Sequence, residues 1–365
     1  MIIGILSDTH EDKMRALPHI VADMRKRGVE VILHCGDIVA RHLDPNLFGG
    51  LPVFCALTED QLDLPEFKNP PDGWIFTRPG KRIIRVGGLT IYLGHKRSFD
   101  FLANSEAQVK VILQRLRMET DGLTLVCSGH THHQILLGGL VRFVNPGAVV
   151  GSLFDHSYEY AVFDTEREEI IFCRILADPI IDQKTFSLAV ISDSFDVSKR
   201  DEGFWKKLAE QLYQRDVSTI IHCGNIDPVD IGHPDLSGFK VFFNLTAGQA
   251  KPGSLPENWF QISKECPIVE VYGHYFYVDL ELSTDLQDQS DADMNRLCRD
   301  RRTRFGRIDY VLTGTTTEPL MDESEWTRII SPGDVRSSRD FVVICLPRHE
   351  ITFSNIPRQP LPPLT

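Results

Sequence analysis

Three short apolar segments, each followed at once by acidic or imidazole side chains, constrain the fold of this chain most. Residues 2–6, 29–34 and 123–127 are rich in β-branched side chains, as buried strands are. The groups that follow them are Asp8 and His10, Asp37, and His130 and His132. Polar groups at the carboxyl ends of such strands meet in the crevice where α/β sheets bind ligands. The sequence therefore predicts an α/β fold with a polar site at one edge of a sheet.

The side chains in this predicted crevice are those that bind divalent metals. Carboxylate oxygens and neutral imidazole nitrogens bind Mn, Fe, Zn and similar ions, and a shared carboxylate can bridge two ions. Asp8 and His10 are two residues apart, as are His130 and His132, so in extended backbone both members of a pair leave on the same side. We interpret these four residues and Asp37 as a metal site.

The chain also contains two related halves. "ILSDTHED" at residue 5 returns as "VISDSFDV" at residue 190, and "LHCGDIV" at residue 33 returns as "IHCGNID" at residue 221. The matching positions lie 185 to 188 residues apart: Asp8 and Asp193, Asp37 and Asn225, Gly129 and Gly314, Pro146 and Pro332. Such a long period indicates two domains and not solenoid units. We predict domains over residues 1–178 and 184–357, a linker too short for free swinging, and a proline-rich tail over residues 358–365.

The order of the motifs resembles one known family. Asp-x-His, then Gly-Asp, then Gly-His-x-His followed by "VNPGAV" at residues 144–149 resembles the calcineurin-like metallophosphoesterases. More narrowly, it resembles their small phosphodiesterase branch, whose fold the retromer scaffold subunit shares. The resemblance is strong in the first half and weak in the second. It implies two tandem calcineurin-like domains, each a two-sheet β-sandwich flanked by helices.

The resemblance also implies which residues bind metal. The first ion would be held by Asp8, His10, Asp37 and His132. The second ion would share Asp37 and use His130. Two of its other ligands in the family differ in this chain. Leu93 stands where the first histidine of the family's His-Gly-His motif falls, and Glu59, or Asp60, stands where the family has an asparagine. An isobutyl group donates nothing to a metal. We therefore expect one firmly bound ion and a second ion that is weakly bound or absent, with Glu59 as its substitute ligand. The expected cofactor is one or two ions of Mn, Fe, Zn or Ni, with Mn favoured.

The implied reaction is hydrolysis of a phosphodiester or phosphomonoester by metal-bound hydroxide, with Asp37 central to the site. His95 could face the same crevice and protonate the leaving group, or it could be a surface or loop histidine. We expect His133 to be a neighbour of the ligands, and Asn145 to shape the turn that supports the His130 loop.

The second half has lost most of these groups. Its residues at the matching positions are Asp193, Phe195, Asn225, Ala247, Asp279, Thr315 and Thr317. Phenylalanine and two threonines thus replace three imidazoles. Clustered carboxylates are costly to bury without an ion. A site that no longer binds metal is therefore expected to have replaced charged ligands with neutral residues. We predict that the second domain binds no catalytic metal and is a structural pseudoenzyme.

Composition narrows the class of protein. A hydrophobic content of 42% with 25% charged residues is typical of a soluble globular chain, and no run approaches the roughly 18 apolar residues of a membrane span. The net charge of −12 argues against general nucleic-acid binding, and the basic run at residues 299–304 is interpreted as a solvated helix face. Because the 8 cysteines include no CxxC pair and the first strand follows almost directly on Met1, we expect reduced thiols, no presequence and a cytoplasmic protein.

Two functional hypotheses remain. The first is a metal-dependent phosphoesterase for a small phosphate-ester substrate, with the second domain available to a protein partner. The alternative is a non-catalytic scaffold or binding protein that retains a partial metal site. Leu93 and the altered segment at residues 58–60 favour the alternative, whereas the five metal-type side chains favour the enzyme. The natural substrate would be set by the loops at residues 60–81 and 96–104, whose shapes the sequence does not give.

Overall fold

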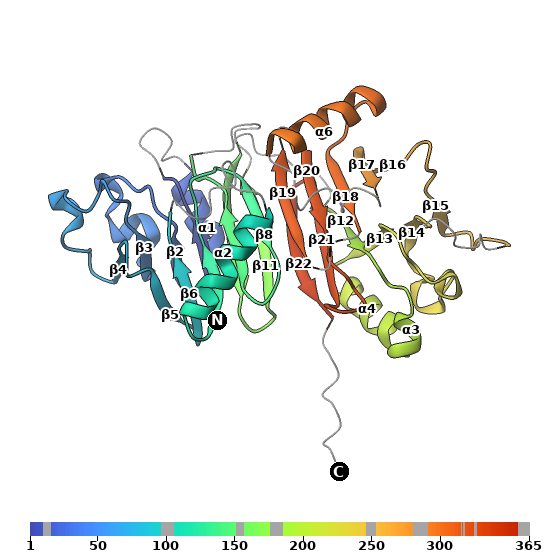
Figure 1. Cartoon of the computed structure of the whole chain (residues 1–365), viewed down its shortest axis with the longest axis horizontal. Coiled ribbons are helices and arrows are strands. Elements are labelled where there is room, and N and C mark those ends of the chain that lie inside the picture. The colour runs from blue at the N-terminus through green and yellow to red at the C-terminus, as the bar shows by residue number, and fades with distance from the viewer. Residues whose placement is uncertain are drawn as a thin grey trace, which may run out of the picture.

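Two large sheets and a few helices make up a mixed α/β molecule (Figure 1). The computed structural model describes residues 1–9, 16–95, 106–150, 157–175, 185–245, 253–279, 291–314, 316, 318–324 and 327–356. Within these residues, no helix has the length and apolar character needed to cross a membrane.

The larger sheet has twelve strands among the described residues. From its outer edge, the first half contributes β4 (Trp74–Thr77), β3 (Val53–Ala56), β2 (Val31–His34), β1 (Ile2–Leu6), β10 (Tyr158–Asp164) and β11 (Glu169–Ile175). The second half continues with β22 (Glu350–Asn355), β21 (Asp340–Leu346), β12 (Phe186–Ile191), β13 (Val217–His222), β14 (Lys240–Phe243) and β15 (Trp259–Gln261). The two sequences of strands mirror each other, including a parallel β1–β2 pair that corresponds to a parallel β12–β13 pair.

The ten-stranded sheet repeats this mirror order. The first half contributes β5 (Ile83–Val86), β6 (Leu89–Leu93), β7 (Leu123–Cys127), β9 (Arg142–Pro146) and β8 (Gln134–Leu137). The second half adds β19 (Leu320–Ser324), β20 (Thr327–Ser331), β18 (Tyr310–Thr313), β17 (His274–Asp279) and β16 (Ile268–Val271). Each sheet therefore crosses from one half to the other, through the antiparallel pairs β11–β22 and β8–β19.

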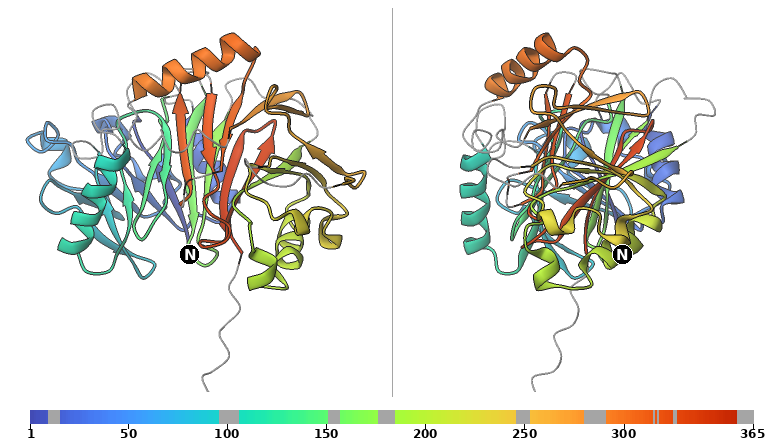
Figure 2. Two further views of the ribbon diagram at one scale, coloured as in Figure 1. Left: turned by 45° about the vertical axis from the view of Figure 1, so that its right-hand side comes forward. Right: turned by 90° about the vertical axis from the view of Figure 1, so that its right-hand side faces the viewer.

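The helices cover the outer faces of the two sheets. They are α1 (Leu17–Lys26), α2 (Glu106–Glu119), α3 (Val197–Arg200), α4 (Phe204–Tyr213) and α6 (Asp291–Phe305), together with the short 3-10 segments η1 (Ala40–His42), η2 (Pro45–Phe48), η3 (Pro65–Phe67), η4 (Pro228–Asp230) and η5 (Pro234–Leu236). Apolar faces of α1 and α4 pack on the larger sheet, and those of α2 and α6 on the smaller one. Figure 2 shows α2 (teal) and α6 (orange) on one side of the sheets and α1 (blue) on the other.

One apolar core lies between the sheets and includes residues of both halves, for example Leu33 and Ile221. The seam between the halves carries two matching ion pairs. Nη2 of Arg27, after α1, lies 2.7 Å from Oε2 of Glu350 at the start of β22, and Arg215, after α4, pairs in the same way with Glu169 at the start of β11. The two halves thus exchange equivalent contacts across the seam.

The predicted α/β fold with two sheets and flanking helices is confirmed. The mirrored strand order supports two related halves, and the basic run at residues 299–304 lies on α6. One feature differs from the expectation of two separate sandwiches, since both sheets run through the seam. Unpaired β11 and β8 would leave open edges, and pairing with the second half covers them. The domain bounds stay a prediction, because residues 176–184 and the tail at 358–365 lie outside the described residues.

Candidate metal centre

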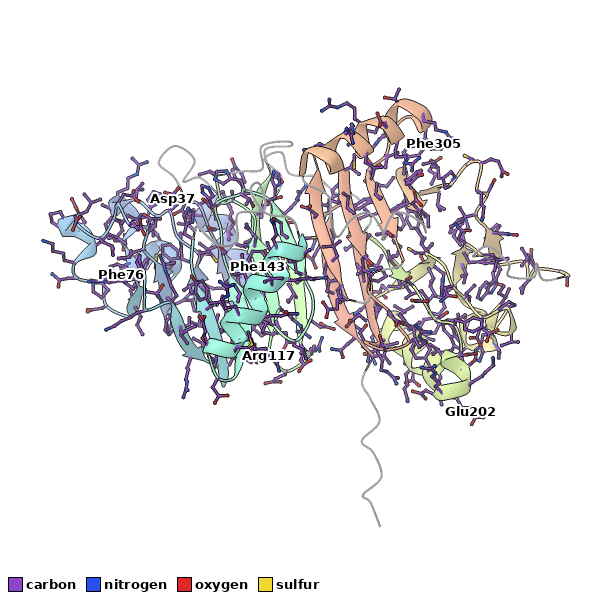
Figure 3. The ribbon with its side chains drawn as sticks, in the orientation of Figure 1. Asp37, Phe76, Arg117, Phe143, Glu202 and Phe305 are labelled. Atoms are coloured by element: carbon purple, nitrogen blue, oxygen red, sulfur yellow. The ribbon has the colours of Figure 1, made fainter. Side chains whose placement is uncertain are left out.

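The turns that follow β1, β2 and β7 share an uncommon backbone conformation. Asp8 and Asp37 have φ of 55°, and His130 and His132 have φ of 81° and 59°. Left-handed φ values are rare outside glycine and gather at functional sites. The first two turns are joined, since the Asp8 N–H donates to the Gly36 carbonyl over 3.1 Å and the Thr9 N–H donates to the Asp37 carbonyl over 3.1 Å. The strand ends therefore deliver their polar side chains to one place, near the labelled Asp37 of Figure 3.

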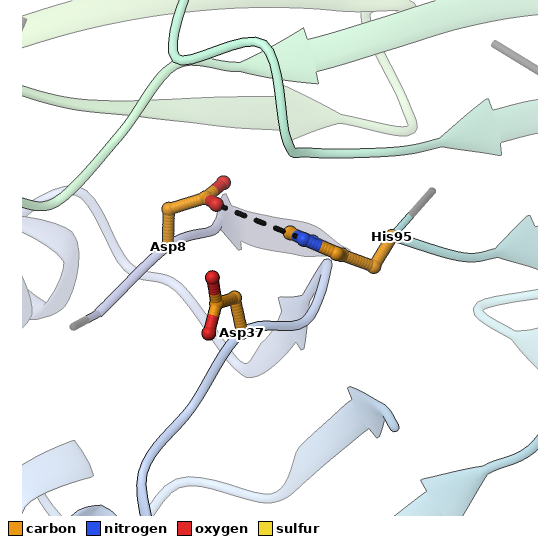
Figure 4. Close-up of side chains that lie close together, drawn as sticks. All are labelled: Asp8, Asp37 and His95. Carbon is orange, nitrogen blue, oxygen red and sulfur yellow. Dashed lines mark ion pairs between the residues drawn. The ribbon is translucent and has the colours of Figure 1, made fainter. Parts of the chain in front are cut away.

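Two carboxylates and an imidazole meet there. One ligand atom from each of Asp8, Asp37 and His95 lies within 4.8 Å of the others, and the three side chains point toward one another in Figure 4. Oδ1 of Asp8 lies 3.9 Å from Nε2 of His95 and 3.3 Å from Nε2 of His132. Asp8 is only 1% exposed, and its Oδ2 accepts the His130 N–H over 3.1 Å. This group has the donors and the spacing to hold a metal ion.

His95 supplies an imidazole to this group, although Leu93 does not. Leu93 is buried in the core between the sheets, whereas His95, 4% exposed, lies against Asp8. Its Nδ1–H donates to the Cys35 carbonyl over 3.1 Å, because a carbonyl can only accept. This bond leaves the lone pair of Nε2 toward Asp8, which is the arrangement of a metal-binding imidazole.

His95 lies in the bend after β6 but is buried, so it is a loop histidine that faces the crevice and not the surface. Its predicted role as a proton donor stays a prediction, and its position beside Asp8 also suits a ligand. The signal in the sequence was its position just after the end of an apolar strand, where the other site residues also lie. His10 lies outside the described residues. The ligand roles of the other predicted residues stay predictions.

Comparison with known proteins places the first half in a family. Residues 1–168 match the model of the calcineurin-like phosphoesterase superfamily domain. The first half of this chain is a calcineurin-like domain. The predicted resemblance is thereby confirmed for these residues.

Solved structures similar to the chain cover about half of it. They include an archaeal phosphodiesterase (19% identity, TM-score 0.36, 48% of this chain and 100% of that chain). Vps29 from Entamoeba histolytica in complex with zinc matches at 18% identity and a TM-score of 0.32, over 48% of this chain and 91% of that chain. A predicted phosphoesterase from Streptococcus pneumoniae matches at 22% identity and a TM-score of 0.30, over 48% of this chain and 88% of that chain. Among curated proteins, none matches this chain.

A buried histidine supports the metal crevice of the calcineurin-like domain. His34, the last residue of β2, accepts the Gly36 N–H on Nδ1 over 3.1 Å, and its Nε2 lies 3.1 Å from Oγ1 of Thr9. Burial lowers the pKa of His34 to about 3, so the ring is neutral at neutral pH. With Nδ1 accepting, Nε2 donates to Thr9. His34 thereby ties the turn after β1 to the turn after β2.

The third turn of the calcineurin-like domain has its own support. Nδ2 of Asn145 donates to the Gly129 carbonyl over 3.1 Å and to Oγ1 of Thr131 over 2.9 Å, as expected of a residue that shapes the turn supporting the His130 loop. Burial, with smaller effects from His132 and Arg174, lowers the pKa of His133 to about 4. His133 is thus a neutral neighbour.

A cavity of about 470 Å³ opens beside the metal-type side chains. It is lined by Asp37, Thr58, Glu59, Asp60, Pro79, Gly80, Arg82, Tyr92, His95 and His130. Its volume falls in the range of small-molecule sites. Glu59 and Asp60, the alternatives for the replaced asparagine, both line this cavity.

The matching crevice of the second half keeps the backbone conformation, and an amide replaces one of its carboxylates. Asp193 and Asn225 have φ of 55° and 54°, and the Asn225 amide donates to the Asp193 carboxylate. Asp279, which matches Leu93, accepts from Tyr277 over 3.0 Å and from Arg301 over 3.4 Å. Ala247, Thr315 and Thr317 lie outside the described residues. The absence of a catalytic metal in this half stays a prediction.

Proposed function

We propose that the calcineurin-like domain is a metal-dependent phosphoesterase. The observation that carries the proposal is the meeting of Asp8, Asp37 and His95, whose ligand atoms lie within 4.8 Å of one another. With His132 beside Asp8, the donors are carboxylate oxygens and imidazole nitrogens, the set that suits Mn, Fe, Zn and Ni. We favour Mn, and His10 completes the proposed set.

The burial of these groups supports a resident cation. Two carboxylates held this close repel each other, and taking charges out of water is costly unless an opposite charge offsets the cost. Asp8 is almost fully buried, so solvent does little to screen it. A divalent ion between Asp8 and Asp37 would remove both penalties.

Each protein group then has a definite task. A bound divalent ion would acidify a coordinated water and neutralise charge on the phosphoryl oxygens. Asp8 and Asp37 hold the ion, and the Cys35 carbonyl fixes the ring of His95 so that Nε2 faces the same place. His130 and Glu59, which line the cavity with Asp37, are the groups that would hold a second ion. One ion is sufficient for the proposal.

The second half is proposed to be a structural pseudoenzyme. The Asn225 amide donates a hydrogen bond to the Asp193 carboxylate, which would otherwise need another partner such as a metal ion. Its exposed surface is available to a protein partner. A non-catalytic scaffold is the competing function for the whole chain, and Leu93, which removes one expected ligand, is the observation that favours it.

The decisive experiment compares the wild-type protein with Asp37→Asn. Metal content and Mn affinity would be measured on the purified full chain, together with hydrolysis of an aryl phosphodiester and an aryl phosphomonoester. We expect Mn-dependent turnover that falls by at least about a thousandfold in Asp37→Asn, because that side chain is central to the ion site. Asp72→Asn, at an exposed carboxylate outside the residues that line the cavity, is the matched control and should retain activity. Wild-type turnover no faster than that of Asp37→Asn would establish the scaffold.

A further inference from the structure

One wall of the cavity carries an arginine with unused donors. Arg82, just before β5, lines the cavity with Asp37, His95 and His130. Its Nη1 is buried from solvent and has no hydrogen-bond partner among the residues that the structure describes. Its main chain is fixed, because its carbonyl accepts the Leu93 N–H over 2.8 Å.

A guanidinium in this position calls for an anion. Burial lowers the pKa of Arg82, against the opposing effects of Tyr92, Cys55 and Glu59, but the group keeps its charge at neutral pH. Leaving a buried N–H of a charged group unbonded is costly. Burial also raises the pKa of Tyr92, on the same wall, so its phenol stays protonated as a second donor.

The hydrogen-bond acceptor for Arg82 must be an anion that binds only when the metal ion is bound. Asp37, Glu59 and Asp60 also line this space, so an anion entering without a cation would meet repulsion. A divalent ion on Asp8 and Asp37 would neutralise these two carboxylates, and Arg82 would add a positive charge on the cavity wall. A phosphoryl group between the two would place some oxygens on the ion and others on the arginine, whose planar fork suits phosphate.

Resting on the proposed phosphoesterase function, we propose that Arg82 binds nonbridging oxygens of the reacting phosphoryl group and makes this cavity select phosphomonoesters over phosphodiesters. A monoester has three nonbridging oxygens and a second negative charge. A diester has two such oxygens and a single charge, so it offers less to an arginine once an ion is bound. Arg82 is thus the specificity residue of the cavity.

The test combines binding with turnover and includes a matched variant. Arg82→Gln removes the charge, and Arg85→Gln removes an exposed guanidinium from the same strand, β5. Binding of inorganic phosphate to the Mn-loaded protein would be measured by calorimetry. We expect Arg82→Gln to weaken it at least about tenfold, as for a lost charge-assisted hydrogen bond, while Mn affinity and the Arg85→Gln variant stay within about twofold of wild type.

Turnover gives the second readout. The ratio of kcat/KM for an aryl monoester to that for an aryl diester should fall at least about tenfold in Arg82→Gln, and Arg82→Lys should recover part of it. An unchanged ratio, or phosphate binding equal to that of wild type, would overturn the proposal. If the wild-type protein hydrolyses neither ester, the phosphoesterase function fails. Loss of phosphate binding in Arg82→Gln would still establish the anion site.

Discussion

The crevice of the calcineurin-like domain and its counterpart in the second half have the same backbone and different charge. The turns at Asp8 and Asp193 both have φ of 55°. Each is supported by a buried histidine, His34 or His222, whose pKa burial lowers to about 3 and whose Nδ1 accepts a glycine N–H two residues ahead. The second half has nonetheless replaced a carboxylate with an amide, Asn225.

This difference shows that the turn geometry does not require the second carboxylate, since Asp37 and Asn225 have φ of 55° and 54°. Oγ of Ser194 lies 2.7 Å from Nε2 of His222, as Thr9 lies beside His34 in the first half. The apolar strands and these neutral hydrogen bonds position the turns. Both halves thus keep the same turns although most of the metal-type side chains differ between them.

The largest expected difference is between the substitutions of Asp8 and of Asp193 in their effects on Mn binding and turnover. Mn at a hundred times its Kd should stabilise the wild-type chain by about 2.7 kcal/mol. We expect Asp8→Asn to abolish that stabilisation and to lower turnover by at least about a thousandfold. Asp193→Asn should preserve both, because burial raises the pKa of Asp193 and the Oδ1 of an asparagine can still accept the Asn225 amide. Thermal unfolding with and without Mn measures the first quantity.

A loss of Mn stabilisation in Asp193→Asn equal to that in Asp8→Asn would break the comparison. It would mean that the second half also binds the ion. Metal analysis of the two variants at saturating Mn tests this. If the second half binds no metal, Asp193→Asn should bind as much Mn per chain as the wild type.

A smaller effect should appear at the glycines that close the two crevices. A Cβ on Gly129 would lie 1.8 Å from Oγ of Ser7 and 2.8 Å from Oδ2 of Asp8, and a Cβ on Gly314 would lie 2.3 Å from Oγ of Ser192. Overpacking of this kind costs about 1–3 kcal/mol. We expect both Gly129→Ala and Gly314→Ala to lower the free energy of unfolding in urea by this amount. Only Gly129→Ala should also weaken Mn binding, because only it displaces a ligand.

Partner variants supply the control for this pair. Ser7→Gly should restore part of the stability of Gly129→Ala, and Ser192→Gly part of that of Gly314→Ala, since each removes the hydroxyl that the new methyl group meets. The contacts with Oδ2 of Asp8 and with Cβ of Cys223 remain. If either single alanine variant were as stable as the wild type, the turn would have shifted to make room for the methyl group.

The sequence predicted the parts of this fold that depend on local pattern. The apolar runs became β1, β2 and β7, and the motif spacing indicated the two halves that the mirrored strand orders support. The seam could not be predicted, because pairing of β11 with β22 and of β8 with β19 joins segments far apart in the chain, and the edges themselves carry no motif.

The candidate site was predicted where ligand identity follows from a motif, and missed where it follows from position. Asp8 and Asp37 stood out because each follows a buried strand. His95 was assigned a different role, because its approach to Asp8 depends on where β6 ends relative to β1. Arg82 belongs to no motif, and its place in the cavity becomes visible only when β5 and the segment after β3 lie side by side.

The smallest effect should come from Asp340, which begins β21. Its counterpart by strand register is Glu159 of β10, which pairs with Arg174, whereas Asp340 lies opposite Asn355. Asp340 lines a cavity of about 550 Å³ at the seam, near Arg142, Glu318 and Glu168. Burial raises the pKa of Asp340 from 3.8 to about 6, opposed by its hydrogen bond with Ser338 and by Arg142.

The sign of the pH effect follows from this raised pKa. The folded chain binds a proton at Asp340 more tightly than the unfolded chain does, so Asp340 costs no stability below pH 3.8 and lowers the stability as the pH rises from there to about 6. Asp340→Asn removes that cost. We expect it to match wild type at low pH and to be more stable above about pH 7, by about 1 kcal/mol after allowance for partial exposure. Urea unfolding of both proteins across this pH range measures the difference. A constant difference at every pH would show that the carboxyl is not responsible, and that the seam responds to the shape of the side chain instead.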